Sequence, residues 1–187
     1  MRLVLASGSP RRAALLSSIG LSFEVVVPDV DESRYPEEDP EHYVERVARL
    51  KADVVDDAGA IVMAADTTVV LESRVLGKPA HPAEARSMLR QLSGETHAVY
   101  TGVAVASDGA VSSAVDRTLV RLSELTDEEI DAYVATGEPL DKAGAYALQG
   151  LGGMFVESVD GSPSNVIGLP LHLAVRLLRA HGLDPLD

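Results

Sequence analysis

The sequence contains no cysteine and no tryptophan, and aromatic residues make up only 4% of the chain. Without cysteine the chain has no disulfide framework and no thiolate metal site. The scarcity of aromatic side chains argues against a platform on which nucleic-acid bases stack. No stretch approaches the roughly twenty apolar residues of a membrane span, and the opening residues MRLVLASGSP lack the apolar length of a secretory signal. We therefore expect a cytoplasmic protein.

Basic residues are also scarce, since 16 Lys and Arg stand against 29 Asp and Glu and the formal net charge is -13. An acidic surface repels a phosphate polymer, so we do not expect a nucleic acid polymer as partner. Because no apolar run is long enough to span a membrane, we expect no membrane as partner either. The five histidines are scattered without an HExxH spacing, which argues against a zinc site. A small anion can still bind where a few cations converge, so the basic residues in predicted turns are the ones to follow.

The order of predicted elements indicates a mixed α/β protein with a long antiparallel hairpin midway, formed by a single domain over residues 1–187. Its length and its 46% of hydrophobic residues are enough for a sizeable core. Periodicity and turn residues predict strands at 2–6, 23–27, 60–71, 97–106, 110–122 and 154–159, and helices at 10–19, 40–57, 82–92, 126–137 and 170–180. Residues 160–170 read as a loop. Within the second helix, one face is predicted to hold Tyr43, Val47, Leu50 and Val54.

The stretch SGSPRR follows the first predicted strand and opens the first helix. Such a turn aims free backbone N–H groups at a point where an anion can sit, and Ser7 and Ser9 add hydroxyl donors. Arg11 and Arg12 fall in the first helical turn, where cations oppose the helix dipole unless an anion is bound. Arginine gives forked contacts to phosphate oxygens. The pattern favours an anion site slightly over an ordinary helix cap followed by solvated arginines.

Asp66 lies inside the apolar strand MAADTTVVL, where burial of a carboxylate is costly unless it is paired or holds a metal. This favours a functional residue over a strand residue on a solvated face or at a bulge. Lys51 at the polar edge of a helix and Lys78 in a turn read by themselves as solvated. Glu32 lies in an acidic loop and could hold Mg²⁺ together with substrate phosphates. Gln149 could read a base edge through its amide, although its segment also reads as a surface loop.

Segments spread over nearly the whole chain together resemble the Maf family of nucleoside triphosphate pyrophosphatases, also called septum formation inhibitor proteins. The resemblance is carried by LASGSPRRAALL, DVDES, RVARLKA, AADTTVVLESRVLGKP, MLRQLSGETHAVYTGVAV and YVATGEPLDKAGAYALQGLGGMFVESVDGSPSNVIGLP. It implies a mixed α/β fold with a cleft between two lobes, similar to the inosine triphosphatase fold. It also implies a homodimer, which members of the family often form.

The resemblance implies hydrolysis of a nucleoside triphosphate between its α and β phosphates, giving a monophosphate and pyrophosphate with Mg²⁺ or Mn²⁺. Catalysis is assigned to Asp66, Lys51 and Lys78, with Asp66 as the proposed general base or as a metal ligand beside Glu32. Phosphate binding is assigned to Ser7, Ser9, Arg11 and Arg12. The subgroup that acts on dTTP and UTP carries an arginine, a threonine and a glutamine at three selectivity positions, which here are Arg11, Thr67 and Gln149.

Two other functions remain open at this point. One is the same chemistry on 7-methyl-GTP or on modified nucleotides, which a panel of nucleotides would separate. The other is a regulator of cell division that binds nucleotides without hydrolysing them. The set of Asp66, Lys51 and Lys78 argues against the second, because a pure binder has no need of a carboxylate embedded near phosphates.

Overall fold

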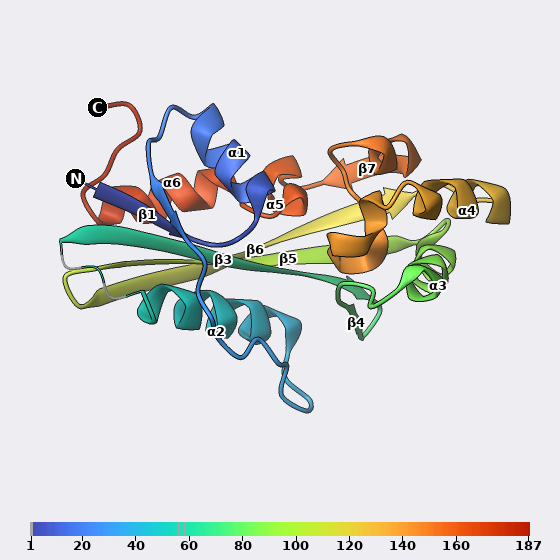
Figure 1. Ribbon diagram of the computed structural model, residues 1–187, viewed down its shortest axis with the longest axis horizontal. Helices are drawn as coiled ribbons and strands as arrows, with labels where there is room; N and C mark the ends of the chain where they lie inside the picture. The colour runs from blue at the N-terminus through green and yellow to red at the C-terminus, as the bar shows by residue number, and fades with distance from the viewer. Residues whose placement is uncertain (1, 56, 58) are drawn as a thin grey trace. The chain divides into compact units, whose positions relative to one another are not determined.

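The computed structural model describes residues 2–55, 57 and 59–187, and its architecture is mixed α/β (Figure 1). The strands are β1 Arg2–Ala6, β2 Glu24–Val26, β3 Ala60–Leu71, β4 Arg74–Leu76, β5 Thr96–Ser107, β6 Ala110–Leu122 and β7 Val156–Asp160. The α-helices are α1 Pro10–Ser18, α2 Pro40–Asp53, α3 Pro82–Leu92, α4 Asp127–Ala135, α5 Pro163–Ile167 and α6 Leu171–Ala180. Short 3₁₀ helices η1 Glu138–Asp141, η2 Ala143–Ala145 and η3 Leu151–Phe155 lie between α4 and β7.

Over the described residues the strands pair in the order β2-β1-β3-β5-β6-β7, and β4 pairs with β3. Strand β1 runs parallel to β2 and to β3, whereas β4 is antiparallel to β3 and β7 is antiparallel to β6. A two-residue turn joins β5 to β6, with positive φ at both Asp108 (48°) and Gly109 (78°). This is the type I′ geometry that suits a hairpin. The expected mixed sheet and its long antiparallel hairpin are confirmed.

The chain divides into two compact units, and the three long strands β3, β5 and β6 contribute to both. Unit 1 comprises Met1–Asp66, Thr101–Asp116 and Gly168–Asp187. Unit 2 comprises Thr67–Tyr100 and Arg117–Ile167. Each unit has its own hydrophobic core.

Alternation along the strands distributes the core of unit 1 over two faces of the sheet. Leu3 and Leu5 of β1 pack with Leu16 of α1 and with the buried leucines of α6. Val4 and Ala6 point the other way and pack with Ala48 and Ala52 of α2. Because successive side chains of a strand face opposite sides, one strand serves both layers. Figure 1 shows the result, with α2 on one face and α1 and α6 on the other.

The core of unit 2 gathers around the second half of β3 and the helices α3 and α4. Its buried members include Val69 and Leu71 of β3, Leu89 of α3, Ile130 of α4 and Phe155 of η3. The ring of Tyr133 meets that of Phe155 edge-on, with centroids 5.2 Å apart. The 3₁₀ segments that follow α4 are therefore packed into this core rather than forming a surface loop.

Three expectations about elements were wrong in detail. Helix α2 ends at Asp53 instead of near Asp57, and residues 56 and 58 lie outside the described part of the chain. Its buried face is Val44, Val47, Ala48, Lys51 and Ala52, so of the four residues predicted to share a face only Val47 is buried. The expected loop at 160–170 contains the short helix α5, which Pro163 opens at a position where proline suits a helix start.

Candidate active site

A buried lysine–aspartate pair lies between β3 and α2. Asp66 is in phase with Val62 and Ala64, whose side chains pack against α2, so it faces the same helix. Lys51 lies one turn from Ala48 on the buried face of α2, and its Nζ donates to Asp66 Oδ1 at 2.8 Å. Asp66 is 7% exposed and Lys51 is 6% exposed. The alternatives of a solvated strand residue and a solvated lysine are therefore wrong for these two side chains.

Glu32 is the third member of this charged cluster. Its Oε2 lies 2.8 Å from Lys51 Nζ, and its side chain remains half exposed, unlike that of Asp66. One ammonium thus faces two carboxylates in unit 1. Removing a single partner from a buried ion pair is costly because it leaves the other charge uncompensated. Counted by themselves, these three side chains carry one surplus negative charge.

The loop that carries Glu32 is fastened to α2 by Tyr43 and Arg46. The Tyr43 hydroxyl donates to the backbone carbonyl of Glu32 at 3.0 Å. Arg46 donates to both carboxylate oxygens of Glu38, at 2.6 and 2.9 Å, and to the carbonyl of Ser33 at 2.9 Å. Its guanidinium also lies 4.1 Å from the ring centroid of Tyr35. A forked ion pair of this kind fixes direction as well as distance, so Glu32 is presented from an ordered loop.

The SGSPRR stretch forms the turn between β1 and α1, and Arg12 within it is buried rather than solvated. Arg12 Nε donates to the carbonyl of Gly168 at 2.8 Å, and its Nη1 donates to Ser7 Oγ at 3.0 Å. The backbone N–H of Ser9 also donates to Ser7 Oγ, at 3.2 Å. Ser9 is the N-cap residue of α1, and among the described residues no side-chain hydrogen bond caps that helix. The N-terminus of α1 and a preoriented guanidinium therefore lie in the same turn.

Burial lowers the pKa of Arg12, and the charge of Asp66 opposes this effect. The neighbouring cation Arg11 lowers the pKa further, whereas Glu32 raises it. These interactions place Arg12 within electrostatic reach of both carboxylates. Arginine remains protonated in proteins, so the turn carries a fixed positive charge beside the acidic cluster.

The predicted site residues divide between the two units. Unit 1 holds Ser7, Ser9, Arg11, Arg12, Glu32, Lys51 and Asp66, and Thr67, Lys78 and Gln149 belong to unit 2. Thr67 follows Asp66 directly on β3 and is half-buried. Lys78 and Gln149 are exposed, in the segments after β4 and between η2 and η3. The contacts described above join Ser7, Ser9 and Arg12 in one group and Glu32, Lys51 and Asp66 in another. They do not test the role given to any of the predicted site residues.

Within the described part of the chain, no group of three or more His, Asp or Glu side chains could hold a metal ion. Two carboxylates, Glu32 and Asp66, converge on one ammonium nitrogen. Carboxylate oxygens are the ligands Mg²⁺ prefers, and Mg²⁺ is commonly bound by one or two of them together with substrate phosphates. This donor set fits a metal that arrives with a triphosphate better than a resident ion held by protein alone.

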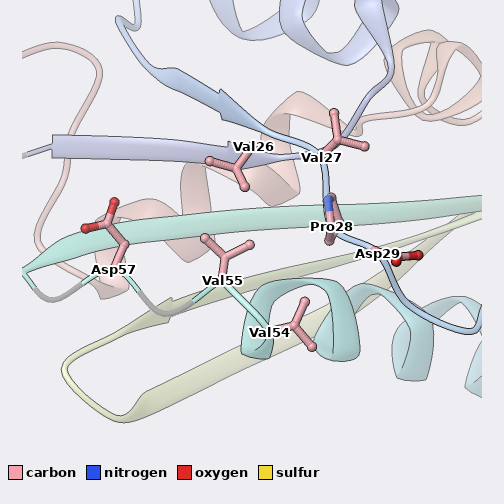
Figure 2. A pocket seen from close by; sticks show the side chains of 7 residues that line it. All are labelled: Val26, Val27, Pro28, Asp29, Val54, Val55 and Asp57. Atoms are coloured by element: carbon pink, nitrogen blue, oxygen red, sulfur yellow. The ribbon is translucent and has the colours of Figure 1, made fainter.

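Unit 1 also has a pocket of about 390 Å³ where β2 and α2 end (Figure 2). Its lining is mainly apolar, with two aspartates, and comprises Val26, Val27, Pro28, Asp29, Val54, Val55 and Asp57. None of the predicted site residues is among them. The pocket is therefore not the charged cluster described above.

Sequence reasoning missed three residues that support this cluster. Gly168 accepts from Arg12 through its carbonyl, and a backbone acceptor 156 residues away leaves no signal in the sequence. Tyr43 was expected only as a member of one helix face, but its hydroxyl donates to the backbone carbonyl of Glu32. Arg46 lies three residues after Tyr43 on α2, a spacing that places both on one side of a helix and could have indicated a shared role.

Comparison with known proteins identifies the family. A model described as Maf-like protein matches residues 2–181. This chain belongs to the Maf family. A protein of Anaeromyxobacter dehalogenans strain 2CP-C named dTTP/UTP pyrophosphatase is 55% identical over 185 residues, covering 97% of this chain and 94% of that protein. A Bacillus cereus strain AH820 protein with the same name is 47% identical over 185 residues, covering 98% of this chain and 97% of that protein.

The fold is also shared with a solved structure of distant sequence. The Staphylococcus aureus Ham1 protein superposes with a TM-score of 0.50 at 15% identity, covering 97% of both chains. At this identity the likeness concerns the fold alone, and it agrees with the mixed α/β architecture expected of a Maf-family chain. Among the described residues, no helix combines the length and the apolar character needed to span a membrane.

Proposed function

We propose that this chain is a nucleoside triphosphate pyrophosphatase that hydrolyses dTTP and UTP to the monophosphate and pyrophosphate. The observation that carries the proposal is that unit 1 holds both the buried Arg12 turn and the Lys51–Asp66–Glu32 cluster, and that Arg12 interacts electrostatically with both carboxylates. A triphosphate brings several negative charges, and a turn with fixed donors and cations offsets them. The relatives named dTTP/UTP pyrophosphatase, which cover nearly the whole chain, support the choice of substrate.

In the proposed reaction, a water oxygen attacks the α phosphorus and the bond from that phosphorus to the bridging oxygen of the β phosphate breaks. Pyrophosphate leaves with that bridging oxygen. Arg12 already has its direction fixed by Gly168 and Ser7, so phosphate binding requires little ordering of this side chain. In this proposal Asp66 orients the water and accepts its proton. Lys51 holds Asp66 in place and balances charge as negative charge develops on the leaving group.

We further propose that Glu32 and Asp66 hold a divalent cation, Mg²⁺ or Mn²⁺, together with the substrate. When bound, such a cation neutralises phosphate charge and activates water. Equilibrium binding of Mn²⁺ in the presence of a non-hydrolysable dTTP analogue, followed by electron paramagnetic resonance, tests this assignment without turnover. Loss of Mn²⁺ binding in Glu32→Gln supports it, and unchanged binding in both Glu32→Gln and Asp66→Asn contradicts it.

The decisive test of function is pyrophosphate release from a panel of nucleoside triphosphates by wild type and by Asp66→Asn. Asp53→Asn is a matched control, because Asp53 is exposed at the end of α2. We expect turnover of dTTP and UTP that is lost in Asp66→Asn and retained in Asp53→Asn. Preference for 7-methyl-GTP would support the pyrophosphatase reaction but contradict the assignment of dTTP and UTP as substrates. Binding of nucleotides without pyrophosphate release would support a non-catalytic regulator.

Two further proposals are a homodimer, which rests on the family resemblance, and a cytoplasmic location, which rests on the lack of cysteine and of a long apolar stretch in the sequence. Sedimentation equilibrium of the purified protein tests the first, since a dimer has twice the mass of the 19.7 kDa chain. Fractionation of cells that express the protein tests the second.

A further inference from the structure

The segment that carries Gln149 is anchored on both sides of that residue. Two positions before it, the backbone N–H of Ala147 donates to the Tyr133 hydroxyl at 3.2 Å. Two positions after it, the backbone N–H of Leu151 donates to Glu138 Oε2 at 3.0 Å. Gln149 itself is exposed. The glutamine thus sits at the middle of a short arch whose two ends are fixed by side chains from outside the arch.

Both anchors belong to one hydrogen-bonded group at the end of α4. The Tyr133 hydroxyl donates to Glu138 Oε1 at 2.8 Å, and the same oxygen accepts from the backbone N–H of Gly152 at 2.9 Å. One carboxylate therefore accepts three hydrogen bonds, two of them from the arch. Hydrogen bonds to a charged acceptor are stronger than those between neutral groups. This makes Glu138 the central connection of the arch.

The glycines of the arch leave the space that this arrangement requires. A Cβ on Gly150 would lie 2.6 Å from Glu138 Oε2, and φ there is +129°. A Cβ on Gly152 would lie 2.4 Å from the Tyr133 hydroxyl oxygen. Both contacts are shorter than side chains tolerate, so only glycine lets the backbone approach the two side chains this closely. The glycines of QGLGG thus serve the contact with Tyr133 and Glu138.

The state of the carboxylate suits this role. Burial raises the pKa of Glu138, but the hydrogen bonds from Gly152, Leu151 and Tyr133 outweigh it and lower the pKa overall. Lys142 adds to the effect by its charge, and its Nζ donates to the Glu138 carbonyl at 2.6 Å. Glu138 is therefore ionised at neutral pH and acts only as an acceptor.

We propose that Tyr133 and Glu138 are positioning residues for nucleobase recognition, which fix the backbone on either side of Gln149 so that its amide meets the pyrimidine in one orientation. This inference rests on the proposed function, in which Gln149 reads the base. An amide that must present its donor and acceptor side by side gains from a fixed backbone, because ordering it on binding would cost free energy. Neither residue is assigned a contact with substrate.

The test compares UTP with CTP, which share the triphosphate and sugar and differ at the base edge that an amide can read. The variants are Tyr133→Phe, which keeps the ring against Phe155 but removes the hydroxyl, and Glu138→Gln, which keeps the size but removes the charge and replaces one acceptor oxygen with an NH2 donor. Gln149→Ala is the reference. Glu128→Gln is the matched control, since Glu128 is an exposed residue of α4. Circular dichroism melting establishes that each variant is folded.

We expect Tyr133→Phe and Glu138→Gln to lower kcat/KM for UTP and dTTP about tenfold, the scale of a lost hydrogen bond, chiefly through KM. The kcat/KM for CTP should stay unchanged, so the ratio of kcat/KM for UTP to that for CTP falls. In the Gln149→Ala background, Tyr133→Phe and Glu138→Gln should cause no further decrease in kcat/KM for UTP. Hydrogen exchange should also speed up at the amides of residues 147, 151 and 152.

An equal loss of kcat for all nucleotides in these variants would overturn the positioning role and leave the pyrophosphatase intact. Additive losses in the Gln149→Ala background would also overturn it. If wild type releases no pyrophosphate from UTP or dTTP, the proposed function itself fails, so the two failures are distinguishable. If Tyr133→Phe does not fold, Glu138→Gln carries the comparison, because it preserves the phenol ring and its packing.

Discussion

Protonation of His97 should destabilise the folded protein as the pH falls below neutrality. His97 is 2% exposed, and its Nε2 lies 2.8 Å from the Tyr146 hydroxyl oxygen, with the two rings edge-on. Its buried Nδ1 has no hydrogen-bond partner among the described residues. A charged imidazole there would carry an N–H without an acceptor, so burial lowers the pKa of His97 to about 4.

The direction and size of the effect follow from linkage. In the unfolded chain the imidazole has a pKa of 6.5, so between this value and about 4 the unfolded state binds a proton that the folded state excludes. Stability is therefore fully present above pH 6.5 and is lost as the pH falls towards 4. The loss from this single group amounts to about 2 kcal/mol between pH 7 and pH 5 and to about 3 kcal/mol in total.

Urea unfolding of wild type and His97→Gln at pH 7 and pH 5, followed by far-UV circular dichroism, measures this effect. Circular dichroism is the suitable probe because the chain has no tryptophan. The variant is expected to be less stable at pH 7 but to lose about 2 kcal/mol less than wild type on acidification, with m unchanged. Equal losses in the two proteins would refute the reasoning, since the remaining carboxylates titrate in both.

Three further predictions concern stability, each measured by urea unfolding at neutral pH. Lys51→Ala leaves Asp66 buried without its ammonium and should lower the free energy of unfolding by about 3–5 kcal/mol. Lys78→Ala, at an exposed position, should change it by less than about 0.5 kcal/mol. Similar losses in the two variants would contradict the ion-pair argument. Gly102→Ala places a Cβ 2.4 Å from a backbone carbonyl oxygen of α2 and should lower the free energy of unfolding by about 3 kcal/mol. Unchanged stability would mean that α2 can shift away from the added methyl group at little cost. Thr126→Ala removes one half of the capping box of α4 and should cost about 1 kcal/mol; an unchanged midpoint would show that the cap is redundant.

Local signals in the sequence were enough to predict most elements of the fold. Periodicity and turn residues predicted β5, β6 and α4 to within two residues of their observed ends. The burial of Asp66 followed from its apolar neighbours on β3. These features depend on residues close together in the chain, so their causes are visible in the sequence.

The contacts that build the site depend on tertiary packing and were not predictable in the same way. Lys51 faces Asp66 because of the rotation of α2 about its axis, and the helix is rotated relative to the face expected from its apolar residues. The carbonyl of Gly168 meets Arg12 through the return of the chain after α5. The segment after α4 has no periodicity, and its order comes from one carboxylate that three separate donors share.

Unit 1 is assembled from three stretches of chain that are far apart in sequence. The first strand, β1, packs its leucines against α6, which lies more than 160 residues later. During synthesis, β1 leaves the ribosome long before its packing partner exists. Its apolar side chains therefore stay exposed to solvent, or are covered by another protein, until nearly the whole chain has been synthesised. Truncation before α6 should therefore leave the amino-terminal strand exposed and the protein prone to aggregation, so the two ends of the domain mature together.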